Sequence, residues 1–403
     1  SPAATPPNIV FILSDDHSYP FLGCYGRPEM KTPHLDAFAA QGMKFHRMFT
    51  GAPQCVPSRA CFMTGRSPVA CRITRFSSPL PQDEITYPEI LKQEAGYFVG
   101  VLGRSYHLDG SGRGGEVSGR VFEAHQMQTF KKRYDYVDAS GQDNIPETMA
   151  AFFDQRPAGK PYYLWVNFSD PHHPWDSGKN PPDPSKINVP GSLPDLPGVR
   201  SDLSRYEGEI EHMDGDFQRV LDIIKARAGL ENTLIIFTSD NGGSTAENND
   251  TKYPADDYPT GKLTASNHPL RGQKGQLYEG GSRVPTLLSW PAELKPGQID
   301  TPAHITDWMP TLCAVAGAKP TQDLKWDGIN LWPQLSSTEP VKPRAIYTVG
   351  PGFSARSVRD GDWKLIVYRK GAKSEAASSP TGLNPSASGG SSAEVVEISS
   401  LAA

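Results

Sequence analysis

Three short apolar runs, rich in β-branched and aromatic residues, constrain the fold of this chain more than any other feature. They span residues 8–13, 162–168 and 233–238, and each is continuous rather than alternating, as in strands buried on both faces of a parallel sheet. Helical spacing marks other stretches, at residues 34–41, 87–95, 146–155, 203–228 and 307–316. This alternation predicts an α/β fold with a large, mostly parallel mixed sheet flanked by helices.

The pattern changes after about residue 341. Short strands at 345–349, 355–359 and 363–368, with a turn at Asp360-Gly361, predict a small antiparallel subdomain. We therefore expect a large α/β domain over residues 1–340 and a small C-terminal subdomain over residues 341–403. From residue 373 onward, a composition rich in Ser, Ala, Gly and Pro predicts poor order or an extended wrap.

Bulk composition excludes several classes of partner. The chain has 403 residues, with 40 Lys and Arg against 45 Asp and Glu, so it offers no basic surface for nucleic acid. No apolar run approaches the roughly 20 residues that cross a bilayer, so no membrane partner is expected. The polar, Pro-rich start without Met is typical of the spacer left after a signal peptide is removed, and we expect a periplasmic or secreted protein. Because there are five cysteines, at least one lies outside any intramolecular disulfide.

Oxygen-rich side chains follow two of the predicted strands directly. Asp15 and Asp16 come after the first run, and Asp240 and Asn241 come after the third. Ligand sites in open α/β sheets lie beyond the carboxyl ends of the strands, so the two pairs can meet at one edge. Carboxylate and amide oxygens suit Ca²⁺ or Mg²⁺ rather than zinc. For either pair taken alone, a turn or a helix cap is the alternative role.

The segment Cys-Val-Pro-Ser-Arg at residues 55–59, followed by Thr-Gly-Arg at 64–66, fits the Cys-x-Pro-x-Arg signature of sulfatases. Alone, this motif would mark an ordinary buried cysteine beside a helix with Pro in its first turn, but further segments follow in the family's order. From residue 8 to about residue 368, the chain resembles a type I, formylglycine-dependent sulfatase of the alkaline phosphatase superfamily. The resemblance implies that a formylglycine-generating or anaerobic sulfatase-maturating enzyme converts Cys55 into a formylglycine aldehyde.

The resemblance also implies a metal site. Asp15, Asp16, Asp240 and Asn241 match the family's metal ligands, and an oxygen of the modified Cys55 completes the set. The implied cofactor is one divalent ion, Ca²⁺. Residue Arg59 matches the arginine that holds the aldehyde hydrate, a role that suits its planar and permanently charged fork.

Residues 96–107 resemble the second signature of the family. Arg104 stands where the family normally has Lys, and Val99 stands where it usually has Ser or Thr. The resemblance makes Arg104 a contact for the sulfate group. His107 matches the histidine that deprotonates the hydrate.

Two later segments complete the implied site. Pro-His-His-Pro-Trp at residues 171–175 resembles the Pro-His-x-Pro segment of the family, which favours His172 over its neighbour His173. The resemblance places either His172 or Lys274 to protonate the leaving alcohol. Leu-Arg-Gly-Gln-Lys-Gly at residues 270–275 matches the segment whose lysine binds sulfate, which assigns that role to Lys274.

The implied activity is hydrolysis of an organic sulfate ester to an alcohol and inorganic sulfate. One hydroxyl of the hydrated aldehyde attacks sulfur, and His107 then removes a proton from the second hydroxyl, so that sulfate leaves and the aldehyde returns. Positive charge from Arg104, Lys274 and the metal would stabilise the sulfate oxygens.

The substrate is less constrained than the reaction. A carbohydrate sulfate is expected, either a small molecule or an oligosaccharide, because irregular loops carry cations and aromatic rings that suit a sugar: Arg113, Arg120, Trp175, Tyr253 and Tyr258. The same residues suit an aryl sulfate. A phosphonate monoester or phosphodiester hydrolase would use the same site, and a non-catalytic binder of sulfated glycans would keep Cys55 as a thiol.

Overall fold

The computed structural model describes most of the chain. The described residues are 6–74, 79–104, 108, 130–176, 178, 180–245, 265–336, 343–369 and 395–401. Among these, no helix is both long enough and apolar enough to cross a membrane.

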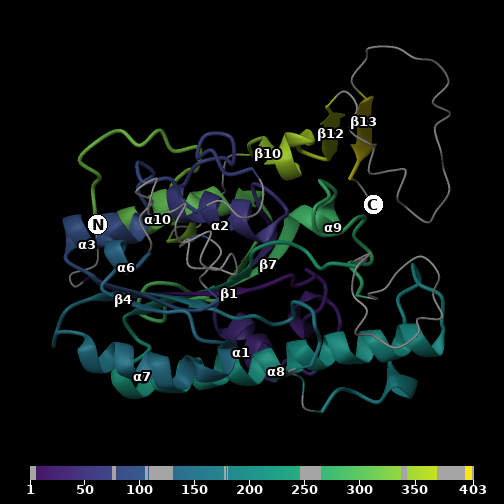
Figure 1. Ribbon diagram of the computed structural model, residues 1–403, viewed down its shortest axis with the longest axis horizontal. Helices are drawn as coiled ribbons and strands as arrows, with labels where there is room; N and C mark the ends of the chain where they lie inside the picture. Colours follow the sequence, from purple (N-terminus) through teal and green to yellow (C-terminus); the bar gives the residue numbers. More distant parts are fainter. Residues whose placement is uncertain are drawn as a thin grey trace, which may run out of the picture.

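A large sheet forms the centre of the molecule (Figure 1). Its strands lie in the order β4 (Tyr136–Asp138), β3 (Phe98–Gly103), β5 (Tyr162–Asn167), β1 (Asn8–Ser14), β6 (Thr233–Ser239), β7 (Arg283–Ser289), β2 (Met43–Phe49) and β8 (Gly297–Ile299), with β9 (Ala303–His304) also pairing with β2. All of the described pairings in this sheet are parallel except the two made by β7. The predicted fold, a mostly parallel mixed sheet, is confirmed.

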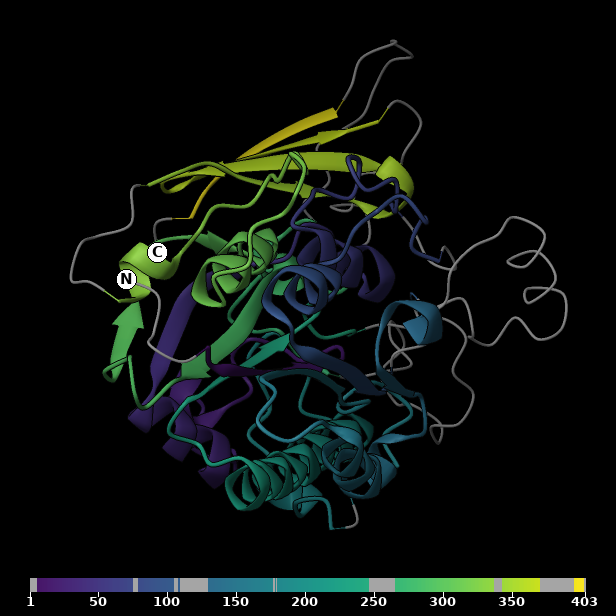
Figure 2. The ribbon, with the colours of Figure 1, turned by 90° about the vertical axis from the view of Figure 1, so that its left-hand side faces the viewer.

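Helices cover both faces of this sheet (Figures 1 and 2). One face carries α1 (Pro33–Gln41), α7 (Ile145–Gln155) and α8 (Pro197–Arg227), and the other carries α2 (Cys55–Thr64), α3 (Tyr87–Ala95) and α10 (Trp308–Val315). The shorter helices are α6 (Phe130–Arg133), α9 (Glu279–Ser282) and α11 (Trp332–Leu335), and the 3₁₀ turns are η1 (Gly23–Tyr25), η2 (Gln142–Asn144), η3 (Pro184–Lys186), η4 (Ile305–Asp307) and η5 (Pro351–Phe353).

Strand β1 shows why its sequence is a continuous apolar run. Ile9, Phe11 and Leu13 belong to the core on one face of the sheet, and Val10 and Ile12 belong to the core on the other. All five side chains are fully buried. Successive side chains of a strand point to opposite faces, so only a strand covered on both faces needs an apolar residue at every position.

A second, four-stranded antiparallel sheet lies beside the helical layer that contains α2 and α10 (Figure 2). Its strands, in order, are β10 (Ile346–Val349), β11 (Ala355–Asp360), β12 (Trp363–Tyr368) and β13 (Val395–Ser400). It packs near α9, where Lys364 Nζ lies 3.1 Å from Glu279 Oε1. The predicted small subdomain is therefore present, and the domain division at residue 340 stays a prediction because residues 337–342 lie outside the described part.

Of the two alternatives predicted for the C-terminal end, poor order is wrong for residues 395–400. These residues form β13, which pairs along its whole length with β12. Val-Val-Glu-Ile has ordinary strand propensity, but the Ser- and Gly-rich residues before it dominated the composition of the window. Helix α8 also begins earlier than predicted, at Pro197, because proline is well tolerated in the first turn of a helix.

Candidate active site

Four neighbouring strands of the large sheet bring the candidate residues together at one edge. Strands β3, β5, β1 and β6 are adjacent and parallel, so their carboxyl ends lie side by side. Asp15 and Asp16 follow β1, Arg104 follows β3, His172 lies in the loop after β5, and Asp240 follows β6. This is the edge at which open α/β sheets bind their ligands.

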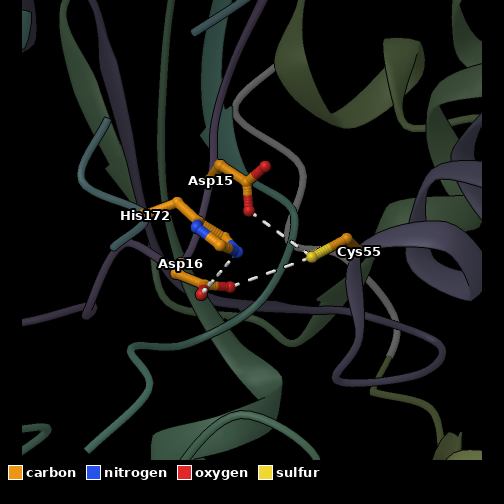
Figure 3. Close-up of side chains that lie close together, drawn as sticks. All are labelled: Asp15, Asp16, Cys55 and His172. Carbon is orange, nitrogen blue, oxygen red and sulfur yellow. Dashed lines mark hydrogen bonds and ion pairs between the residues drawn. The ribbon is translucent and has the colours of Figure 1, made fainter. Parts of the chain in front are cut away.

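Cys55 enters this edge from α2, of which it is the first residue (Figure 3). Its Sγ lies 3.4 Å from Asp15 Oδ1 and 3.9 Å from Asp16 Oδ1. Burial, and then the neighbouring charge of Asp15, raise the pKa of the Cys55 thiol well above its ordinary value. An unmodified Cys55 is therefore a neutral thiol at physiological pH and a poor nucleophile.

Arg59, one helical turn after Cys55, ties the strand ends together. Its side chain is fully buried, and its Nε and Nη2 groups lie 3.1 Å and 3.0 Å from Asp240 Oδ2 and Asp15 Oδ2 respectively. Its Nη1 donates to Asn167 Oδ1 at 2.9 Å and to the backbone oxygen of Arg104 at 3.0 Å. The planar guanidinium thus contacts the ends of β1, β3, β5 and β6 at once.

Asp16 is the centre of a second set of contacts. Lys274 Nζ lies 2.7 Å from Asp16 Oδ2, and His172 Nε2 lies 3.6 Å from the same oxygen. Asn241 Nδ2 donates to Asp16 Oδ1 at 2.8 Å. Figure 3 shows Asp16 in contact with both the imidazole of His172 and the sulfur of Cys55. The φ angle of Asp16 is 59°, a left-handed conformation that is uncommon outside glycine and often found at functional sites.

Burial and neighbouring charges shift the pKa values of this cluster in different directions. Burial would raise the pKa of Asp16, but Lys274 and then His172 lower it below its ordinary value. Burial and then Asp15 raise the pKa of Asp240 to about 7, although Arg59 opposes them. The pKa of His172 falls to about 4, chiefly through burial, so its imidazole is neutral at pH 7.

The donor set fits a hard divalent cation. Three buried carboxylates, Asp15, Asp16 and Asp240, stand close enough to repel one another, which a cation would relieve. The Oδ1 atom of Asn241 is buried and accepts no hydrogen bond from the residues that the structure describes. A buried amide oxygen without a donor is costly unless a ligand uses it. Oxygen donors of this kind are typical of Ca²⁺ and Mg²⁺ sites.

Two clusters of potential ligands occur in the described part of the chain. In the first, donor atoms of Asp15, Asp16, Cys55 and His172 all lie within 4.8 Å of one another. It includes His172, which the predicted ligand set did not contain. The second consists of Asp143, His212 and Asp216, and sequence reasoning did not find it.

The structure also places the remaining predicted residues. Arg104 Nε lies 3.1 Å from Asp15 Oδ2, at the rim of the cluster, with 12% of its side chain exposed. His173 stacks on His172 with ring centroids 4.5 Å apart. His107 lies outside the described residues, as do Arg113, Arg120, Tyr253 and Tyr258.

The expectation that Trp175 offers an aromatic ring to a sugar is wrong. Its side chain is buried, its Nε1 donates to the backbone oxygen of Pro171, and its ring packs on Tyr206. Sequence reasoning also missed Asn167, the last residue of β5, which binds Arg59 and donates to the backbone oxygen of Leu102. An asparagine at the end of a buried apolar run was the available signal.

Comparisons with known proteins show the family of this chain. The profile of the sulfatase family matches residues 7–318, which is more than half of the chain. The chain belongs to the sulfatase family. Arylsulfatase A of Homo sapiens is 28% identical to this sulfatase, over 91% of this chain and 76% of its own length. N-acetylgalactosamine-6-sulfatase of Homo sapiens is also 28% identical, over 83% of this chain and 67% of its own length.

Solved structures share the fold of this sulfatase. The solved structure of a protein in complex with its substrate D-glucosamine-2-N,6-O-disulfate has a TM-score of 0.66 at 18% identity, over 90% of this chain and 89% of that one. At this identity the likeness shows the fold alone, which is that of the alkaline phosphatase superfamily. By its family, this sulfatase is a sulfuric ester hydrolase.

Proposed function

We propose that this sulfatase hydrolyses a carbohydrate sulfate, using an aldehyde derived from Cys55 and one bound Ca²⁺. The observation that carries the proposal is the position of Cys55, whose sulfur lies 3.4 Å from Asp15 within a buried ring of carboxylates and cations. An oxygen on the carbon that bears this sulfur would lie beside Asp15 and Asp16, two of the residues that would hold the metal. An arylsulfatase would use the same machinery on a different alcohol.

The surroundings of Cys55 favour modification over thiol chemistry. A thiolate there would face three carboxylates, and burial already raises the pKa of the thiol. When hydrated, an aldehyde at this position supplies two hydroxyls on one carbon, next to the metal ligands. We propose that a formylglycine-generating or anaerobic sulfatase-maturating enzyme installs it, and that the protein works in the periplasm or outside the cell.

Cations of this chain would bind the sulfate group. Burial would lower the pKa of Lys274, but coulombic attraction by Asp16 and its neighbours raises it above its ordinary value, so its ammonium stays charged. Arg104, whose Nε lies 3.1 Å from Asp15 Oδ2, adds a permanently charged guanidinium. Both groups can stabilise charge that grows on the sulfate oxygens during the reaction.

The leaving oxygen needs a proton, and two residues are candidates to donate it. Lys274 carries a proton at neutral pH, whereas burial leaves His172 neutral, so His172 would have to gain a proton before it could donate one. A general acid matters most when the leaving alcohol is a poor leaving group. The acid is therefore the residue whose replacement slows alkyl sulfates more than aryl sulfates.

The bound metal would be held by Asp15, Asp16, Asp240 and Asn241, and it would act as a Lewis acid on the reacting oxygens. Dialysis against a chelator should abolish activity, and Ca²⁺ should restore it. Ca²⁺ should also raise the unfolding temperature of the dialysed protein, because it binds only the folded state. Full activity in a sample shown by elemental analysis to be metal-free would contradict the proposal.

Two similar proteins support the proposal that the substrate is a carbohydrate sulfate. One is named for a sulfated amino sugar, and a solved structure of the same fold holds a sulfated glucosamine. The test is a set of parallel assays on one preparation, with sulfated sugars, an aryl sulfate, a phosphonate monoester and a phosphodiester. Highest kcat/KM on a sugar sulfate is expected, and highest kcat/KM on the phosphonate would replace the proposal with phosphonate hydrolysis.

A further inference from the structure

A second buried polar network lies behind His172, and the chemistry proposed above does not use it. It joins three elements that are far apart in the sequence: the loop after β5, the 3₁₀ turn η2 and the helix α8. Its central group is the carboxylate of Asp170, which is buried. A buried carboxylate of this kind must be fully hydrogen-bonded to be tolerated.

Two side chains hold the carboxylate of Asp170. Gln142 Nε2 donates to Asp170 Oδ2 at 2.8 Å, and His212 Nδ1 lies 2.8 Å from the same oxygen. Because the partner is a carboxylate, the proton of this hydrogen bond is on Nδ1 of His212. Gln142 Nε2 also donates to Asp216 Oδ2 at 2.7 Å, and Asp216 lies one turn after His212 on α8.

The same network fixes the turn that leads to His172. Gln142 Oε1 accepts from the backbone N–H groups of Ser169 and Asp170, at 2.7 Å and 3.0 Å. The N–H of His172 donates to the backbone oxygen of Ser169 at 2.9 Å, which closes the turn. The backbone oxygen of Asp170 accepts from the N–H of Asp15 at 3.1 Å, so the turn is tied to the end of β1 as well.

We propose that His212 is a positioning residue, which acts through Asp170 to hold the imidazole of His172 against Asp16. This inference rests on the proposed function, since it concerns the same site. His212 does not touch the reacting centre, because Asp170 and the turn lie between it and His172. Its hydrogen bond with Asp170 raises its pKa, and the charges of Asp170, Asp216 and Glu209 act in the same direction, against burial.

Loss of the hydrogen bond between His212 and Asp170 should release the turn that leads to His172. Without His212, the buried carboxylate of Asp170 keeps only Gln142 as a described side-chain donor. A polar group left short of partners favours a rearrangement that brings water to it. Because His172 is only two residues after Asp170, a shift of the turn moves the imidazole of His172. Displacements of about 1 Å at a reacting centre can lower the rate up to about 100-fold.

The test is a double-mutant cycle on the mature enzyme with a sulfate ester. His212→Leu should lower kcat by about tenfold or more. His212→Asn should keep kcat within about threefold of the wild type, because its amide places an N–H where Nδ1–H stood. In a His172→Ala background, His212→Leu should have little further effect, since the residue it positions is gone. Multiplicative losses in the double variant would overturn the proposal.

A matched control and a second readout separate positioning from general damage. His46→Leu removes another hydrogen-bonded histidine, on β2, and should leave kcat unchanged. The imidazole NMR signal of His172, assigned among the ten histidines by its absence from His172→Ala, should shift in His212→Leu and stay in place in His212→Asn. An unmoved signal in His212→Leu would overturn the positioning role. If the wild-type protein had no sulfatase activity, the proposed function would be refuted. The NMR comparison would still show whether His212 positions the imidazole of His172.

Discussion

Replacing Cys55 by serine should convert this sulfatase into an enzyme that reacts once and then stops. The Cys55→Ser variant keeps a hydroxyl beside Asp15 and Asp16, so it can accept the sulfuryl group and release the alcohol. It lacks a second hydroxyl on the same carbon, so sulfate can leave only through slow attack by outside water. Rapid mixing should show a burst of at most about one alcohol per active site, followed by near silence.

Intact mass spectrometry after the burst should show the Cys55→Ser protein as its sulfate ester. Cys24→Ser is a matched control, because Cys24 is a free thiol within η1 whose N–H donates to Asp36 and not to a candidate metal ligand, and this variant should turn over like the wild type. Repeated turnover of Cys55→Ser at the wild-type rate, with no sulfated species, would mean that water attacks sulfur directly at the metal.

Replacing Arg59 by alanine should remove activity and destabilise the fold. Its guanidinium is fully buried between Asp15 and Asp240, and its removal takes an ion pair away from each of these two buried carboxylates. Breaking a buried ion pair in this way costs about 3–5 kcal/mol. Urea unfolding in the presence of a chelator should show this loss of folding free energy. Turnover should fall because Asp15 and Asp240 lose the guanidinium that holds them together.

An exposed ion pair provides the control for Arg59. Arg227 Nη1 lies 2.8 Å from Asp154 Oδ1, and 41% and 63% of the two side chains are exposed. Arg227→Ala should cost less than about 1 kcal/mol, since solvent screens such pairs. Equal losses of stability in the two variants would show that Arg59 is no more important to the fold than a surface arginine.

The large sheet could be predicted from the sequence because its central strands are covered on both faces. Strands β1, β5 and β6 have no polar interruption, and their continuous apolar runs mark them clearly. Strand β2, Met-Lys-Phe-His-Arg-Met-Phe, mixes polar and apolar residues because several of its side chains are only partly buried. Strand β13 was hidden by the composition of its neighbours. Strand order depends on pairings between distant segments, which no local pattern contains.

The candidate site also contains some residues that the sequence could predict and others that it could not. Asp15, Asp16 and Asp240 could be proposed because they follow recognisable strands, and Cys55 could be proposed because its motif is local. The contacts of Asn167, Asp170 and His212 could not be proposed. Asp170 and His212 are 42 residues apart, and Asn167 and Arg59 are 108 apart, so only the fold brings each pair together. Side chains that hold other side chains in place carry no short sequence signal.

The central claim is that Cys55 supplies an aldehyde, and the mass of the peptide that contains Cys55 tests it most directly. The protein should be produced with an active sulfatase-maturating enzyme, digested, and analysed beside a Cys55→Ala sample that marks the peptide. We expect the mass of a peptide in which an aldehyde replaces the thiol of Cys55, and a hydrazide reagent should label it in the wild type alone. A fully active enzyme whose peptide has the mass of unmodified cysteine, and which resists the hydrazide, would contradict the account.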